Sequence, residues 1–110
     1  MITVPIDTAQ ITDWPSFHAV FAEAMGFPDF YGQNLNAWID CMSDLTTESD
    51  VGMTRVVVPF GSTLALELIG AQDFRTRAPE QFAGLLESVA FLNAEVAEAE
   101  VATRIVLLPR

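Results

Sequence analysis

The stretch from Phe27 to Leu45 constrains this chain most, because a turn-rich segment runs directly into a short amphipathic helix. At about 100° per residue, the apolar side chains fall on one stripe, as in a helix that packs on a core. The polar side chains take the opposite side. Asn34 is expected to cap the helix, since its side-chain oxygen can accept hydrogen bonds from the free amides of the first turn. The stripe holds Leu35, Trp38, Ile39, Met42 and Leu45, and the polar side holds Asn36, Asp40, Ser43 and Asp44.

Length and composition favour one globular domain over residues 1–110. A chain of 110 residues can bury a single modest core. Hydrophobic residues make up 51% of the chain and charged residues 18%, a balance that excludes an intrinsically disordered protein. No continuous apolar stretch approaches the roughly 20 residues that span a bilayer, so we expect no role in a membrane. We expect the free protein to be a monomer.

Acidic residues dominate the charge. Asp and Glu number 15 against 5 basic residues, all of them Arg, and the formal net charge is -10. This balance argues against nucleic acid as a partner, and the acidic half before Arg55 should attract basic proteins. Net charge also aids solubility, so it does not name a partner by itself. The acids of that half are Asp7, Asp13, Glu23, Asp29, Asp40, Asp44, Glu48 and Asp50.

The reactive residue types give no sign of catalysis. Cys41 is the single cysteine, and the N-terminus lacks the features of a signal peptide, so we expect a cytoplasmic protein. Cys41 falls beside the apolar stripe, which favours a buried small residue over a reactive thiol. His18 is the only histidine, and no flanking motif supports a Cys-His or Ser-His-Asp site around it. We therefore predict no enzymatic activity, no metal site and no cofactor.

The remaining elements follow from hydrophobic patterning and from capping signals. The alternation of Ile2, Val4 and Ile6 predicts an edge strand over 1–6, and Asp13 and Gly26 bound a predicted helix at 14–25. A polar loop is expected at 46–52. Because strands separated by helices imply a parallel sheet, we expect an α/β fold. The later elements are a buried central strand at 55–58, a short helix from Ser62 or Thr63 to Gly70, a long helix from Pro79 to about residue 100, and a last strand at 105–108. The predicted apolar stripe of the long helix holds Phe82, Leu85, Leu86, Val89, Leu92 and Val96.

One segment carries a family resemblance. Residues Phe30-Tyr31-Gly32-Gln33-Asn34-Leu35-Asn36-Ala37-Trp38-Ile39-Asp40-Cys41-Met42 resemble the (Phe/Tyr)-Tyr-Gly-x-Asn-Leu-(Asp/Asn)-Ala-(Leu/Trp)-x-Asp-Cys-Leu signature of barstar, the intracellular inhibitor of the ribonuclease barnase. The second half of the chain gives almost no match at the level of residues. The resemblance implies a three-stranded parallel sheet with about four helices packed on it. It also implies a stoichiometric inhibitor of a basic ribonuclease.

The resemblance also gives Asp40 a role, although a lone Asp on a polar helix face is usually only a solvated charge. In barstar-like inhibitors the aligned aspartate enters the nuclease active site and stands in for the substrate phosphate. Three residues depart from the family: Asn36 replaces an acid, Ile39 a tryptophan and Leu45 an aromatic residue. The expected partner-binding residues are Phe30, Asn36, Ile39, Asp40, Ser43 and Asp44.

Those departures leave a second interpretation open. They remove one charge and two aromatic side chains, the residue types that dominate protein interfaces. The chain could therefore be an immunity or regulatory module that uses the same helix to bind a different basic toxin or another basic protein.

Overall fold

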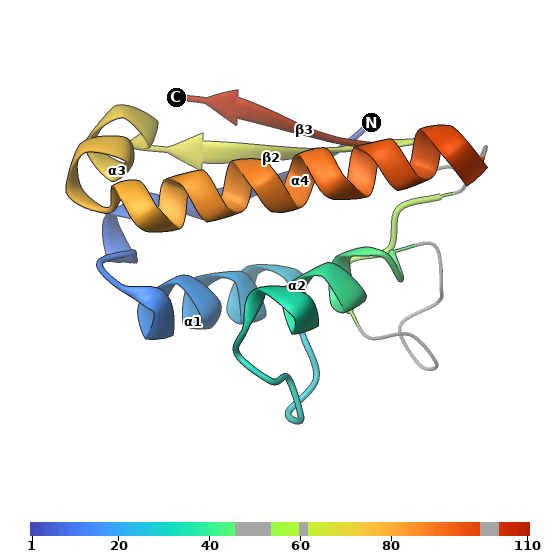
Figure 1. Ribbon diagram of the computed structural model, residues 1–110, viewed down its shortest axis with the longest axis horizontal. Helices are drawn as coiled ribbons and strands as arrows, with labels where there is room; N and C mark the ends of the chain where they lie inside the picture. The colour runs from blue at the N-terminus through green and yellow to red at the C-terminus, as the bar shows by residue number, and fades with distance from the viewer. Residues whose placement is uncertain (46–53, 60–61, 100–103) are drawn as a thin grey trace.

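The fold contains a three-stranded parallel sheet, which lies at the top of the view in Figure 1. The computed structural model describes residues 1–45, 54–59, 62–99 and 104–110, and of residues 96–99 only the backbone. The strand order is β1-β2-β3, so β2 is central and β1 is an edge strand, as predicted. The strands are β1 (Ile2–Asp7), β2 (Thr63–Ile69) and β3 (Arg104–Pro109).

Along the sequence, two α-helices follow β1 and two follow β2. In Figure 1, α4 lies between the strands and α2, and it contacts both β3 and α2. The order strand, helix, helix, strand, helix, helix, strand agrees with the prediction, and the α/β fold with a three-stranded parallel sheet and four helices is confirmed. The helices are α1 (Trp14–Met25), α2 (Leu35–Met42), α3 (Ala71–Arg77) and α4 (Pro79–Ala99), and a 3₁₀ turn, η1 (Thr8–Gln10), follows β1.

Helix α1 begins and ends where its sequence signals predict. The Asp13 carboxylate accepts a hydrogen bond from the Ser16 amide at 3.0 Å, and the Ser16 hydroxyl accepts one from the Asp13 amide at 3.0 Å, which completes a capping box. Gly26 ends the helix with φ of 71°, a left-handed conformation that favours glycine. The helix predicted at 14–25 is therefore confirmed.

The central strand β2 lies where the sequence analysis placed a helix. Leu64, Ala65 and Leu66 are fully buried because β2 is paired along both edges, with Leu66 opposite Val4 on one side and Leu107 on the other. A strand in this position is apolar without clear alternation. Its Leu, Ala and Glu residues favour a helix locally, but sheet pairing overrides that preference. The helix predicted at 62–70 is wrong.

The strand predicted at Arg55–Val58 is wrong as well. This segment instead joins the ends of two helices: the amides of Arg55 and Val56 donate to the Met25 carbonyl at 3.0 and 3.2 Å, and the Val58 amide donates to the Leu45 carbonyl at 2.8 Å. Val58 is fully buried. Val56 and Val57 are partly buried beside Val58, and a β-branched run of this kind shows the same apolar pattern as a central strand, which explains the error. The predicted loop at 46–52 lies outside the described residues.

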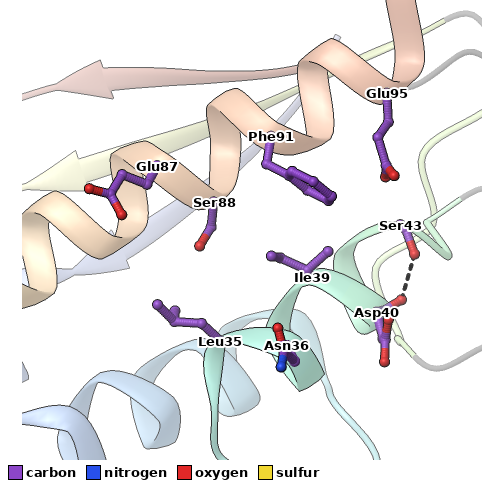
Figure 2. Close-up of a pocket in the computed structure, with 9 residues that line it drawn as sticks. All are labelled: Leu35, Asn36, Ile39, Asp40, Ser43, Glu87, Ser88, Phe91 and Glu95. Atoms are coloured by element: carbon purple, nitrogen blue, oxygen red, sulfur yellow. Dashed lines mark hydrogen bonds between the residues drawn. The ribbon is translucent and has the colours of Figure 1, made fainter. Parts of the chain in front are cut away.

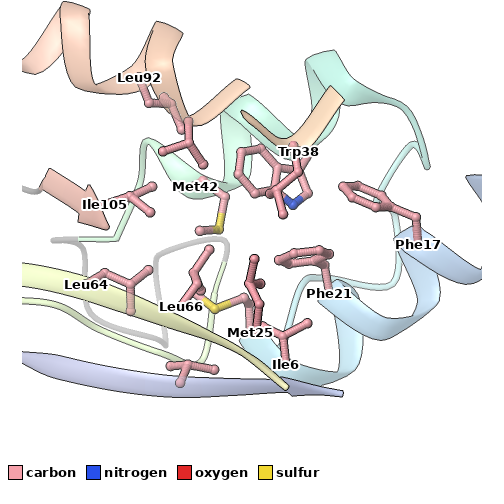
Figure 3. Packing of buried hydrophobic residues seen from close by; sticks show 14 of the residues in the cluster. Ile6, Phe17, Phe21, Met25, Trp38, Met42, Leu64, Leu66, Leu92 and Ile105 are labelled. Carbon is pink, nitrogen blue, oxygen red and sulfur yellow. The ribbon is translucent and has the colours of Figure 1, made fainter. Parts of the chain in front are cut away.

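One hydrophobic core joins the sheet to the helices (Figure 3). Ile6, Leu64, Leu66 and Ile105 of the strands face side chains of α1, α2 and α4, among them Phe21, Trp38 and Leu92. The predicted stripe of α4 is correct at Leu85, Val89 and Leu92 but wrong at Leu86, which is 43% exposed. The side chain of Val96, also predicted there, lies outside the described part of the chain. Leu86 lies just outside the face that α4 turns toward the core. That face holds the buried residues at 81, 84, 85, 88, 89 and 92.

Candidate functional site

The loop before α2 holds a defined shape through local hydrogen bonds. Asn34 caps α2 as predicted: its Oδ1 accepts from the Ala37 amide at 2.8 Å, and its Nδ2 donates to the Gly32 carbonyl at 3.2 Å. Gln33 has φ of 52°, a left-handed conformation that costs a residue with a Cβ about 1 kcal/mol or more. Strain of this kind persists only where the surrounding contacts hold it in place. Here the Asn34 cap directly after Gln33 supplies such a contact.

A hydrogen bond between buried His18 and partly buried Tyr31 anchors the same loop to α1. His18 Nδ1 lies 2.5 Å from the Tyr31 hydroxyl, and the His18 ring, only 3% exposed, stacks on Trp14. Burial lowers the pKa of His18 and raises that of Tyr31, so both side chains stay neutral near pH 7. With Tyr31 turned inward, the neighbouring Phe30 is 78% exposed. The loop thus presents one aromatic side chain to solvent.

The apolar side of α2 packs into the core and fixes the direction of its polar side. Trp38, Cys41 and Met42 are buried, and so is Leu45 after the end of the helix. The Trp38 indole meets the Phe21 ring edge to face, with the ring centroids 5.6 Å apart. Among the described residues its Nε1 has no hydrogen-bond partner. The helix extends to Met42, rather than to Leu45 as the stripe suggested.

The polar side of α2 presents Asp40 to solvent. Asn36, Asp40 and Ser43 are exposed, whereas Asp44 is half-buried. The Ser43 hydroxyl donates to the Asp40 backbone carbonyl at 2.8 Å rather than to the carboxylate (Figure 2). Within the described ranges no cation pairs with that carboxylate. Asp40 therefore keeps its full capacity to accept charge-assisted hydrogen bonds from a partner.

An open groove of about 580 Å³ runs between α2 and α4 beside Asp40 (Figure 2). It brings together four of the predicted residues, whereas Phe30 and Asp44 do not line it. Sequence analysis missed the residues that α4 contributes. Phe91 gave the one available signal, because it is a large aromatic residue outside the predicted stripe of its helix. The groove is lined by Leu35, Asn36, Ile39, Asp40 and Ser43 of α2 and its end, and by Glu87, Ser88, Phe91 and Glu95 of α4.

The groups that could support catalysis are buried or dispersed. Cys41 is 3% exposed, and burial together with the charges of Asp40 and Asp44 raises the pKa of its thiol, which opposes formation of a thiolate. In the part of the chain that the structure describes, no three His, Cys, Asp or Glu side chains gather closely enough to hold a metal ion. No helix in the same part is long and apolar enough to cross a membrane.

Comparison with known proteins places this arrangement in a family. The family model described as barstar, the barnase inhibitor, matches residues 1–108. Comparison with curated proteins finds none that matches the chain. The matched residues include both helices that line the groove, and they extend well beyond the segment that carried the resemblance. Members of this family are inhibitors rather than enzymes, and membership implies binding to a barnase-type ribonuclease. The chain belongs to the barstar family of barnase inhibitors.

Proposed function

We propose that this protein inhibits a barnase-type ribonuclease by inserting Asp40 into the phosphate-binding site of the nuclease. The carboxylate of Asp40, exposed and unpaired within the described residues, on a helix whose other side is held in the core, is the observation that carries the proposal. A ribonuclease binds the phosphates of RNA with cationic side chains, and a carboxylate can accept the same charge-assisted hydrogen bonds. The protein then acts as a stoichiometric inhibitor and needs no cofactor.

The surroundings of Asp40 support a basic partner. Every charged residue that lines the adjoining groove is an acid: Asp40, Glu87 and Glu95. Such a surface attracts basic proteins and repels RNA, and it also disfavours a second copy of this chain, which has a net charge of -10. Phe30, exposed on the loop before the helix, adds an aromatic contact at the edge of the proposed interface.

The departures from the family pattern bear on the choice of partner. Asn36 and Ile39 lie on the proposed interface, so their substitution changes the surface that a nuclease meets. Leu45 is 1% exposed, and its substitution therefore changes the core instead. These positions keep the second interpretation open, in which the same helix serves as an immunity or regulatory module for a different basic protein.

Titration of barnase activity with the purified protein tests the proposal. We expect RNA cleavage to fall linearly to zero at one equivalent of inhibitor when both proteins are well above their Kd. Asp40→Ala should shift the titration from a sharp end point to a shallow curve at the same concentrations. Full barnase activity at a large excess of the parent protein would contradict the proposal and favour the immunity or regulatory module.

A further inference from the structure

Phe91 is an exposed aromatic side chain on the outer surface of α4. It is 52% exposed, and its ring lies over the groove on the side facing Ile39 (Figure 2). Buried residues at 85, 88, 89 and 92 already define the face that α4 turns toward the core, so Phe91 is not needed there. A half-exposed aromatic ring at the rim of a groove is typical of a residue that contacts a binding partner.

The groove around Phe91 combines an apolar floor with an acidic rim. Leu35 and Ile39 of α2 are half-buried and, with Phe91, supply the apolar surface. Glu87 and Glu95 flank Phe91 on α4, and Asp40 lies across the groove on α2. A basic protein surface that presents an aliphatic or aromatic side chain among cations matches this pattern. A second copy of the chain would bring its own acids against these and does not match.

We infer that Phe91 is an aromatic anchor of the nuclease-binding face, contributed by α4 from the wall of the groove opposite Ile39. The occupant of the groove is the barnase-type ribonuclease itself, and the inference rests on the proposed function. Ile39 offers less apolar contact area than the tryptophan of the family pattern, and Phe91 supplies an aromatic ring on the opposite wall of the same groove. The aromatic contact is thus carried by α4 rather than by α2.

The inference is tested by truncating Phe91 and measuring the Kd for catalytically inactive barnase by calorimetry. Phe91→Ala should weaken binding by about tenfold or more. Leu86→Ala is the matched control, because Leu86 is a similarly exposed apolar residue of α4 that does not line this groove, and its Kd should stay within about twofold of the parent value. Phe91→Gln, a second variant with a good helix former, should lose as much affinity as Phe91→Ala.

Asp40→Ala, measured in parallel, separates failure of the inference from failure of the proposed function. Unchanged affinity in both Phe91 variants, together with a large loss in Asp40→Ala, would overturn the inference and leave the proposed function standing. Absence of barnase binding by the parent protein would overturn both. Sedimentation supplies the remaining outcome: a dimer of the parent protein that Phe91→Gln dissociates would assign the groove to a second copy and overturn the inference.

Discussion

Replacing Asn34 by Ala removes the hydrogen bond that begins α2, the helix that carries Asp40. The bond from the Ala37 amide to Asn34 Oδ1 is 2.8 Å long, and loss of an N-cap side chain costs about 1 kcal/mol. The second bond, from Asn34 Nδ2 to the Gly32 carbonyl, lies in an exposed loop where water can replace it, so its loss adds little. We expect the free energy of unfolding to fall by about 1 to 1.5 kcal/mol, which lowers Tm by about 4 to 8 °C.

Urea denaturation followed by tryptophan fluorescence measures this change, and Asn34→Ser is the matched control. Serine is as good an N-cap as asparagine but cannot donate to the Gly32 carbonyl, so it should retain most of the stability. Since α2 has only 8 residues, fraying of its first turn should also weaken binding to the nuclease. Equal stability of Asn34→Ala and Asn34→Ser, within about 0.3 kcal/mol, would refute the assignment of Asn34 as a cap that stabilises the site.

Three further predictions concern charge, pH and partner choice. The association rate with barnase should fall as ionic strength rises past about 0.1 M, whereas the dissociation rate should change less; a flat association rate would assign the acidic charge to solubility alone. The lowered pKa of His18 means that the unfolded chain binds its proton first, so stability should fall as pH drops below about 6.5. In His18→Phe that slope between pH 6.5 and 5.5 should disappear, and an unchanged slope would exclude His18 as its origin. Asn36→Asp combined with Ile39→Trp should raise affinity for barnase at least about tenfold, or about 1.4 kcal/mol, because Asn36 is exposed and Ile39 lines an open groove. Because Ile39 also packs against the core, Tm is measured in parallel to detect overpacking by the tryptophan. A stable double variant with no gain would favour the second interpretation.

Local signals were sufficient where an element is stabilised within its own segment. The caps at Asp13, Gly26 and Asn34 bound α1 and the start of α2, and the structure forms the corresponding hydrogen bonds. Local signals fail for two segments, Arg55–Val58 and Thr63–Ile69. Both segments are apolar and partly buried, and only pairing with β1 and β3, distant in sequence, decides which one is the strand. Helix propensity at Leu64–Leu68 favoured the wrong element because tertiary pairing outweighs it.

The candidate site divides in the same way. Asp40 and its neighbours on α2 could be predicted because they lie within one short segment whose pattern resembles a known family. Phe91 and the acids beside it could not, because they join the site only through the packing of α4 against α2. Leu86 and Ser88 illustrate the difficulty. The apolar pattern predicts that Leu86 is buried, but in the structure Leu86 is exposed and the polar Ser88 is buried.

Calorimetric titration of barnase with the Asp40→Ala and Asp44→Ala variants tests the central claim most directly. If Asp40 enters the phosphate site, its removal leaves nuclease cations buried without a counter-charge, and binding should weaken by about 2 to 5 kcal/mol. This range is in part the one known for the barnase–barstar complex, whose inhibitor belongs to the same family. Asp44 is half-buried and lies outside the groove, so Asp44→Ala should cost less than about 1 kcal/mol. Equal losses at the two positions would contradict the assignment of Asp40 as the group that blocks the nuclease.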